Sequence, residues 1–221
     1  MSSDLQLSPR SRRVPGLDYH PAIACGHLAA ADPELGRLIG LVGACSLRPR
    51  RALSLFQALL RSIVYQQLNG RAAETILTRV LDLYGSRYPA PAELLGTSDE
   101  ALQGAGLSRN KLTSIRDLAR HALDGTVPSS GAARALTDDE LVERLTVVRG
   151  VGRWTVEMLL IFRLGRADVF PLDDLGVRKG FRRAFGMRRL PATITMVRRA
   201  ERWRPYRSVA SWYLWRAAEF D

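Results

Sequence analysis

The sequence has few cysteines and histidines. Its two cysteines, Cys25 and Cys45, lie outside any Cys-x-x-Cys pair, and its three histidines are scattered along the chain. A four-cysteine zinc or iron–sulfur site needs closely spaced thiolate ligands. Such a site is therefore excluded for this chain, and we expect neither a metal centre nor a cofactor.

Long apolar runs are also absent. No uncharged apolar segment approaches the roughly 20 residues that a membrane-spanning helix needs. The first 16 residues, MSSDLQLSPRSRRVPG, lack the apolar middle of a secretory signal peptide and are predicted to form a flexible basic arm. We therefore expect a cytoplasmic protein without a membrane partner, whose folded domain covers residues 17–221.

Negative charge is scarce relative to positive charge. The chain has 33 Lys and Arg against 22 Asp and Glu, a formal net charge of +11, and Lys111 and Lys179 are its two lysines. A cationic protein gains affinity for a polyanion because phosphate contacts release counterions. Arginine suits bidentate phosphate contacts, but its use in place of lysine can equally reflect a GC-rich genome. The sign of the charge thus favours a nucleic-acid partner, whereas the choice of arginine is weak support.

The periodicity of apolar residues predicts an all-α fold. The sequence shows no pair of alternating strands and no internal repeat of fixed period. Helical spacing predicts helices over residues 33–42, 53–68 and 71–84, and one or two short helices within 92–105. Ser108 is expected to cap a further helix, and Pro205 to stand at the start of the last one.

Residues 137–164 are predicted to form two helices joined by a Gly-Val-Gly turn. Thr137 and Glu140 fit a helix start, and Gly150 and Gly152 are expected to end the helix. Such a turn presents backbone N–H groups at a helix N-terminus, where an anion such as a nucleic-acid phosphate is favoured. Taken alone, however, the pattern favours an ordinary helical hairpin within a bundle.

Two adjacent aspartates, Asp173 and Asp174, open the next predicted helix. One of them is expected to be an N-cap. A second fixed carboxylate near a phosphate-binding turn would repel the ligand unless it served a reaction. A negative charge held at a helix N-terminus suits the stabilisation of a developing cation better than proton abstraction.

Two further segments have polar residues whose role stays open. Residues 65–70, Tyr-Gln-Gln-Leu-Asn-Gly, follow an apolar helix. Their amides could form a solvated cap or fill a gap in a base stack. Arg109 and Lys111 lie in the first turn of the helix that Ser108 caps, where they oppose the helix dipole. A bound phosphate would explain these charges, although a solvated helix start explains them as well.

Taken together, these motifs resemble the helix-hairpin-helix DNA glycosylase superfamily, and within it the 3-methyladenine DNA glycosylase II, or AlkA, type. The resemblance covers roughly residues 33–215 and rests on the order and spacing of five segments. They are Tyr65-Gln66-Gln67-Leu68, Gly106-Leu107-Ser108-x-x-Lys111, Leu145-x-x-Val148-x-Gly150-Val151-Gly152-Arg153-Trp154-Thr155, Val169-Phe170-Pro171-x-Asp173-Asp174-x-x-Val177-Arg178, and Arg202-Trp203-Arg204-Pro205-Tyr206-Arg207-Ser208 leading to Trp215.

The resemblance implies a two-lobed all-α fold with the active cleft between the lobes. Longer AlkA relatives have an extra N-terminal β domain, and at 221 residues this chain is expected to lack it. The resemblance also implies base flipping from duplex DNA that contains damaged bases. Separately from the resemblance, we expect a monomer. Asp174 would be catalytic, and Gln67 or Leu68 would fill the gap in the duplex. The base pocket would be lined by Trp154, Trp215, Met158 and Tyr65, and the DNA backbone would be bound by Gly150, Val151, Gly152, Arg153, Ser108 and Lys111.

The chemistry that the resemblance implies is hydrolysis without strand cleavage. Related bifunctional enzymes have a lysine just after the hairpin, where this chain has Trp154, and neither Lys111 nor Lys179 replaces it. Alkylated purines such as 3-methyladenine and 7-methylguanine are electron-poor, so stacking on tryptophan gains about 0.5–2 kcal/mol. They are also good leaving groups, which makes a general acid dispensable. The alternatives are a non-catalytic DNA-binding protein, or a glycosylase of the same fold for ethenoadenine or uracil.

Overall fold

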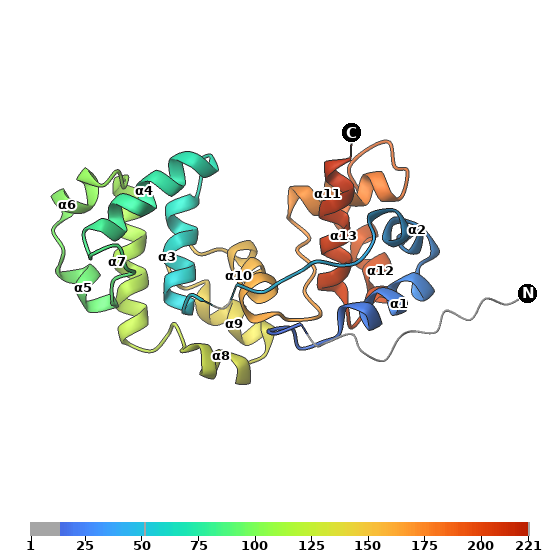
Figure 1. Cartoon of the computed structure of the whole chain (residues 1–221), viewed down its shortest axis with the longest axis horizontal. Coiled ribbons are helices and arrows are strands. Elements are labelled where there is room, and N and C mark those ends of the chain that lie inside the picture. The colour runs from blue at the N-terminus through green and yellow to red at the C-terminus, as the bar shows by residue number, and fades with distance from the viewer. Residues whose placement is uncertain (1–13, 51, 221) are drawn as a thin grey trace, which may run out of the picture. The chain divides into compact units, whose positions relative to one another are not determined.

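The computed structural model describes residues 14–50 and 52–220 (Figure 1). Every regular element among these residues is a helix, which confirms the predicted all-α class. The predicted basic arm over 1–16 lies outside the described residues except for Val14 to Gly16. The chain divides into two compact units. Unit 2 is continuous, from Arg50 to Leu164, whereas unit 1 combines the chain up to Pro49 with the chain from Gly165 onward.

The described part of unit 1 contains six helical elements. They are α1 (Pro21–Ala31), α2 (Pro33–Val42), α11 (Leu175–Ala184), α12 (Thr193–Ala200), the 3₁₀ turn η2 (Glu201–Trp203) and α13 (Arg207–Glu219). Helices α11 and α13 lie side by side (Figure 1). Their backbones approach so closely that a Cβ on Gly180 would collide with the carbonyl oxygen of Leu214. Trp203 is fully buried among Phe170, Phe181 and Phe185, and these rings form the centre of the unit.

A buried ion pair joins the two chain segments of unit 1. The Asp32 side chain is fully buried and caps α2, accepting from the backbone N–H of Leu35. It also accepts two 2.7 Å hydrogen bonds from Arg199 and one of 3.0 Å from the Trp203 indole. Burial by itself would raise the pKa of Asp32, but these hydrogen bonds outweigh burial and hold the pKa below its usual value. The ionised carboxylate thus links α2 to α12 and η2.

Unit 2 contains the remaining helices. They are α3 (Leu55–Tyr65), α4 (Gly70–Asp82), α5 (Pro91–Gly96), α6 (Asp99–Gly104), α7 (Arg109–Leu123), α8 (Ser130–Ala135), α9 (Asp138–Leu145), α10 (Arg153–Leu159) and the π-helical turn η1 (Leu160–Leu164). Helix α3 packs against α4, α7 and α10. Leu59, Leu60 and Ile63 of α3 are fully buried there, as the apolar stripe of that helix predicts.

The predicted helix over 33–42 agrees with α2, but several other boundaries differ. Helix α3 begins at Leu55 because Ser54 and Gln57 form a capping box. It ends at Tyr65, three residues earlier than predicted, since Gln67 adopts a left-handed backbone with φ +58°. Helix α9 ends at Leu145, five residues before Gly150, so the glycines do not stop it as predicted. Pro205 precedes the first residue of α13, Arg207, rather than lying within its first turn.

Candidate functional site

The hairpin turn between α9 and α10 depends on Gly150. Thr137 caps α9 through a capping box with Glu140, and the chain turns back over residues 146–152 before α10 begins. Gly150 has φ +80°, a conformation that disfavours residues with a Cβ. A Cβ at this position would also lie 2.8 Å from Oγ of Ser114. Gly152 is the N-cap of α10 and has no such close neighbour. At Gly150, therefore, both the positive φ and the close approach of Ser114 require glycine. At Gly152, φ is −94° and the position has room for a Cβ, so neither reason applies.

Two side chains hold this turn in place. Nε2 of Gln66 donates a 2.7 Å hydrogen bond to the carbonyl oxygen of Gly150. The backbone N–H of Arg149 donates a 2.8 Å bond to Oδ2 of Asp117 on α7. Because Gln66 is also the C-cap of α3, the hairpin turn is joined directly to the turn between α3 and α4.

One face of α7 contacts both of these turns. Lys111, Ser114 and Asp117 are spaced three apart and therefore share a face of the helix. Ser114 packs under Gly150 and Asp117 binds Arg149, as described above. Nζ of Lys111 donates a 2.6 Å bond to the carbonyl oxygen of Val64 in the last turn of α3, and burial lowers the pKa of this amine. The predicted phosphate contact of Lys111 stays a prediction, but the amine already stabilises the end of α3.

The turn between α3 and α4 exposes the two residues predicted to enter the duplex. Gln67 and Leu68 are both exposed, and the left-handed backbone of Gln67 makes the turn tight. Asn69 caps α4 by accepting a 2.9 Å bond from the N–H of Ala72. The Tyr65 hydroxyl donates to Glu74 on α4, so the Tyr65 side chain braces this helical pair.

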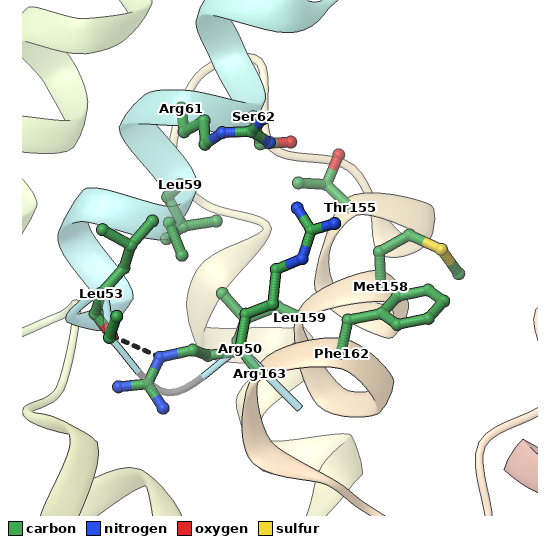
Figure 2. Close-up of a pocket in the computed structure, with 12 residues that line it drawn as sticks. Arg50, Leu53, Leu59, Arg61, Ser62, Thr155, Met158, Leu159, Phe162 and Arg163 are labelled. Atoms are coloured by element: carbon green, nitrogen blue, oxygen red, sulfur yellow. Dashed lines mark hydrogen bonds between the residues drawn. The ribbon is translucent and has the colours of Figure 1, made fainter. Parts of the chain in front are cut away.

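Unit 2 has a pocket of about 690 Å³ between α3 and the helices α10 and η1 (Figure 2). Figure 2 shows Met158 and Phe162 next to each other on the α10–η1 side of the pocket, with Leu59 on the α3 side. Of the predicted base-pocket residues, Met158 lines this pocket, whereas Tyr65 and Trp154 do not. Ser62, Thr155 and Phe162 also line it and were missed from the sequence.

Trp154 lies in the first turn of α10 and is 46% exposed. Tryptophan is highly buried on average, so core packing does not explain this residue. Arg153, the first residue of α10, lies 3.9 Å from Glu157 in an ion pair and is exposed. Ser108 is the N-cap of α7, as predicted, and accepts from the backbone N–H of Lys111.

Asp174 is the N-cap of α11 in unit 1. Its Oδ1 accepts 2.8 Å hydrogen bonds from the backbone N–H of Val177 and from the indole Nε1 of Trp215 on α13. Its side chain is buried, with 9% exposure, whereas Asp173 is exposed. The helix cap expected from the aspartate pair is therefore Asp174 itself, the residue that the resemblance implies to be catalytic.

Two glycines and two ion pairs help to position Asp174, and the sequence analysis predicted none of these contacts. A Cβ on Gly176 would lie 2.8 Å from Cδ1 of Trp215 and 3.1 Å from Oδ1 of Asp174. Gly180, one turn further along α11, allows the close approach to α13 described above. The loop before Asp174 is anchored by Asp168, which forms 2.7 Å ion pairs with Arg204 and Arg207. The Gly-x-x-x-Gly spacing directly after Asp174 was the available signal for this helix contact.

Asp174 and Trp215 belong to unit 1, whereas the other predicted site residues belong to unit 2. The predicted cleft that would unite them stays a prediction. Within residues 14–50 and 52–220, no group of three or more His, Cys, Asp or Glu is placed to hold a metal ion. In the same part of the chain, no helix is both long and apolar enough to span a bilayer.

Comparisons with known proteins agree with this fold. A family model described as the HhH-GPD superfamily of base excision DNA repair proteins matches residues 60–205. DNA-3-methyladenine glycosylase 1 of Schizosaccharomyces pombe is 36% identical over 197 residues, which cover 87% of this chain and 86% of the yeast protein.

Two solved structures are also similar to this chain. The S. pombe 3-methyladenine DNA glycosylase in complex with abasic DNA has a TM-score of 0.77 at 36% identity, covering 88% of this chain and 95% of that one. A DNA-3-methyladenine glycosidase from Bacillus halodurans has a TM-score of 0.82 at 34% identity, covering 89% of each chain.

Proposed function

Because the chain belongs to the HhH-GPD superfamily of base excision DNA repair proteins, we propose that it is a monofunctional DNA glycosylase for alkylated purines. It would act as a monomer, flip a 3-methyladenine or 7-methylguanine out of duplex DNA and hydrolyse the glycosidic bond. The names of its similar proteins support this substrate class, since they include DNA-3-methyladenine glycosylases of yeast and bacteria. The observation that carries the proposal is the buried Asp174 carboxylate, held by Trp215 at the start of α11.

Cleavage of the glycosidic bond develops positive charge on the deoxyribose. A carboxylate fixed beforehand stabilises that charge without reorganising during the reaction. Asp174 fits this role because one hydrogen bond comes from its own helix and the other from α13. The attacking water would be oriented by the same carboxylate. An alkylated purine leaves readily, so the proposed mechanism needs no general acid.

The contacts described above support the following proposed binding roles. The turn at Gly150, Val151 and Gly152, with Arg153 after it, would hold the phosphate backbone. Gln67 or Leu68, both exposed on the tight α3–α4 turn, would occupy the space that the flipped base leaves. Trp154 and Met158 would contact the flipped base together with Trp215, and electron-poor purines favour such aromatic partners. Tyr65 would be a further wall of the base pocket, and its hydroxyl, which donates to Glu74, would brace the α3–α4 turn.

The decisive experiment measures base release and strand cleavage separately on alkylated duplex DNA. We expect the wild-type chain to release 3-methyladenine or 7-methylguanine and to leave the strand intact until alkali is added. The absence of strand nicks follows from Trp154 at the position where lyases have lysine. Nicking without alkali would refute the monofunctional reaction. Release of ethenoadenine or uracil alone would redirect the proposal to another lesion, and no release with retained binding would favour a non-catalytic protein.

The role of Asp174 is tested against its neighbour. Asp174→Asn keeps the size of the side chain but removes its charge, so we expect base release to fall by at least about 100-fold, in line with the loss of a preorganised electrostatic group. Asp173→Asn is the matched control, because Asp173 is adjacent in sequence but exposed. If Asp174→Asn released base as fast as Asp173→Asn, the catalytic assignment would be wrong.

A further inference from the structure

Most of the excess of positive over negative charge lies in one stretch of unit 1. Residues 175–200 contain eight Arg or Lys and no Asp or Glu, a formal charge of +8 within a chain whose total is +11. By contrast, residues 137–164, which include the hairpin, contain four Arg and five Asp or Glu, a formal charge of −1. The hairpin therefore contributes nothing to the excess of positive charge.

Two of these eight charges have partners within the protein. Arg199 is paired with the buried Asp32 and with Glu34. Arg178 is half-buried, and its Nη2 donates a 3.4 Å bond to the carbonyl oxygen of Pro191. The remaining six are exposed, and no carboxylate of the described chain lies within ion-pairing distance of them. They are Lys179, Arg182, Arg183, Arg188, Arg189 and Arg198.

Five of these six residues follow one another on α11 and the loop after it. Val177, Gly180 and Phe181 of α11 are buried, so Lys179, Arg182 and Arg183 emerge on the opposite side of that helix. Arg188 and Arg189 extend from the loop that begins at Gly186. The contact of Arg178 with Pro191 ties the end of this loop to α11. We call Lys179, Arg182, Arg183, Arg188 and Arg189 the basic surface.

We propose that the basic surface binds the phosphodiester backbone of duplex DNA outside the lesion and independently of sequence. A guanidinium group can donate two parallel hydrogen bonds to the oxygens of one phosphate, and four of the five residues are arginine. Unpaired like charges on adjacent turns repel one another, and this cost is offset when a polyanion neutralises them. An extended run of phosphates fits such a row of cations, because each contact releases counterions. The hairpin, which lacks excess charge, would then hold the DNA at the lesion after the basic surface has attracted it.

This inference rests on the proposed function, since it adds a second DNA contact to it. The test measures the dissociation constant for an undamaged duplex as a function of salt. Arg188→Ala/Arg189→Ala removes two charges from the loop, and Lys179→Ala/Arg182→Ala removes two from the outer side of α11. Each removed phosphate contact lowers the magnitude of the slope of log dissociation constant against log salt by about 1. Each double variant should therefore have a slope smaller by about 2 and bind about tenfold more weakly at low salt.

The matched control is Arg79→Ala/Arg120→Ala, which removes two exposed charges from the ends of α4 and α7 in unit 2. It should leave the salt slope within error of the wild type. Thermal unfolding of every variant verifies the fold, and using two separate double variants protects the test against a local packing defect. Equal slopes for the control and both basic-surface variants would overturn the inference.

Base release from alkylated DNA by the wild type is measured in parallel. If base is released but the slopes are equal, the basic surface is refuted and the proposed function stands. If the slopes differ but no base is released, the proposed function fails while the DNA contact stands. If the control lowers the salt dependence of binding as much as the test variants do, then the total charge of the protein, and not the basic surface, determines binding to DNA. That result would also contradict the inference.

Discussion

The indole nitrogen of Trp215 donates a 2.8 Å hydrogen bond to Oδ1 of Asp174, the same oxygen that caps α11. These residues are 41 positions apart, so the contact depends on how α11 packs against α13. A single carboxylate oxygen thereby joins a helix start to a second helix. The orientation of Asp174 is therefore set by tertiary packing as well as by its own helix.

Replacing Trp215 with Phe tests this orientation. The change keeps an aromatic ring but removes the indole donor. A hydrogen bond to a charged group is worth about 1.5–3 kcal/mol, so single-turnover base release should slow by about tenfold or more. The free energy of unfolding should fall by a similar amount, since the buried carboxylate keeps its bond to Val177 and loses the one from the indole, so base release is measured where the variant is still folded. A rate equal to that of the wild type would show that the bond does not orient the carboxylate.

Gly176→Ala should disturb the same contact from another direction. The new Cβ would lie 2.8 Å from Cδ1 of Trp215, closer than side chains normally approach, so the indole must move away from Asp174. We expect base release to fall by about tenfold and stability by about 1–3 kcal/mol. The control is Gly40→Ala in α2, where nothing lies within 4 Å of the new Cβ. That helical change should stabilise the protein by about 0.5–1 kcal/mol.

Gln66→Ala removes the bond between the α3–α4 turn and the hairpin turn. The main chain of both turns should stay folded, but their relative positions should become less fixed. The lost bond is worth about 1 kcal/mol, so the dissociation constant for a duplex with an abasic-site analogue should rise about fivefold. Gln103→Ala, at an exposed position of α6, provides the control. Identical affinities of the two variants would argue against a role for this bond in binding.

Asp32→Asn should weaken unit 1 in a pH-dependent way. Removing one partner of a buried ion pair leaves Arg199 without its main partner and should cost about 3 kcal/mol near neutral pH. The folded-state pKa of Asp32 is lowered, so its stabilisation is present above the unfolded pKa of about 3.9 and is lost as pH falls through the lower folded value. The difference in stability between the two proteins, measured by urea unfolding, should therefore begin to shrink below about pH 4 and continue to shrink as the pH falls through the folded-state pKa of Asp32. A gap that stays constant down to pH 2 would contradict the role of the charge.

Local signals in the sequence were sufficient for much of the fold. The helix over residues 33–42 agrees with the structure because Asp32 and Pro33 mark its start and Gly43 follows its end. The end of α3 could not be predicted, since glutamine has no intrinsic preference for the left-handed backbone that Gln67 adopts. That conformation is set by its neighbours, Gln66 bound to Gly150 and Asn69 capping α4.

In the candidate site, too, the features set by neighbouring residues were predictable, whereas those set by contacts distant in the sequence were not. The adjacent aspartates indicated a capped helix start, and Asp174 is that cap. The packing role of Gly176 and Gly180 could not be predicted from the sequence. A glycine within a helix indicates a close helix contact only once the neighbouring helix is known. Their partners, Trp215 and Leu214, follow more than 30 residues later. Lys111 likewise suggested a phosphate contact, and only the structure reveals the carbonyl of Val64 beside it.

Unit 1 is built from two separate segments of the chain, so its folding requires residues from both ends of the sequence. Unit 2 is continuous, so its core can form while the chain is still being synthesised. Unit 1 has to wait for α13, whose residues come last among the described helices. The hairpin and the turn at Gln67 can thus fold before Trp215 forms its hydrogen bond with Asp174. A chain that ended before residue 207 would contain the elements proposed to bind DNA without the contact that orients Asp174. The proposed reactive centre would then be completed only when α13 packs against α11.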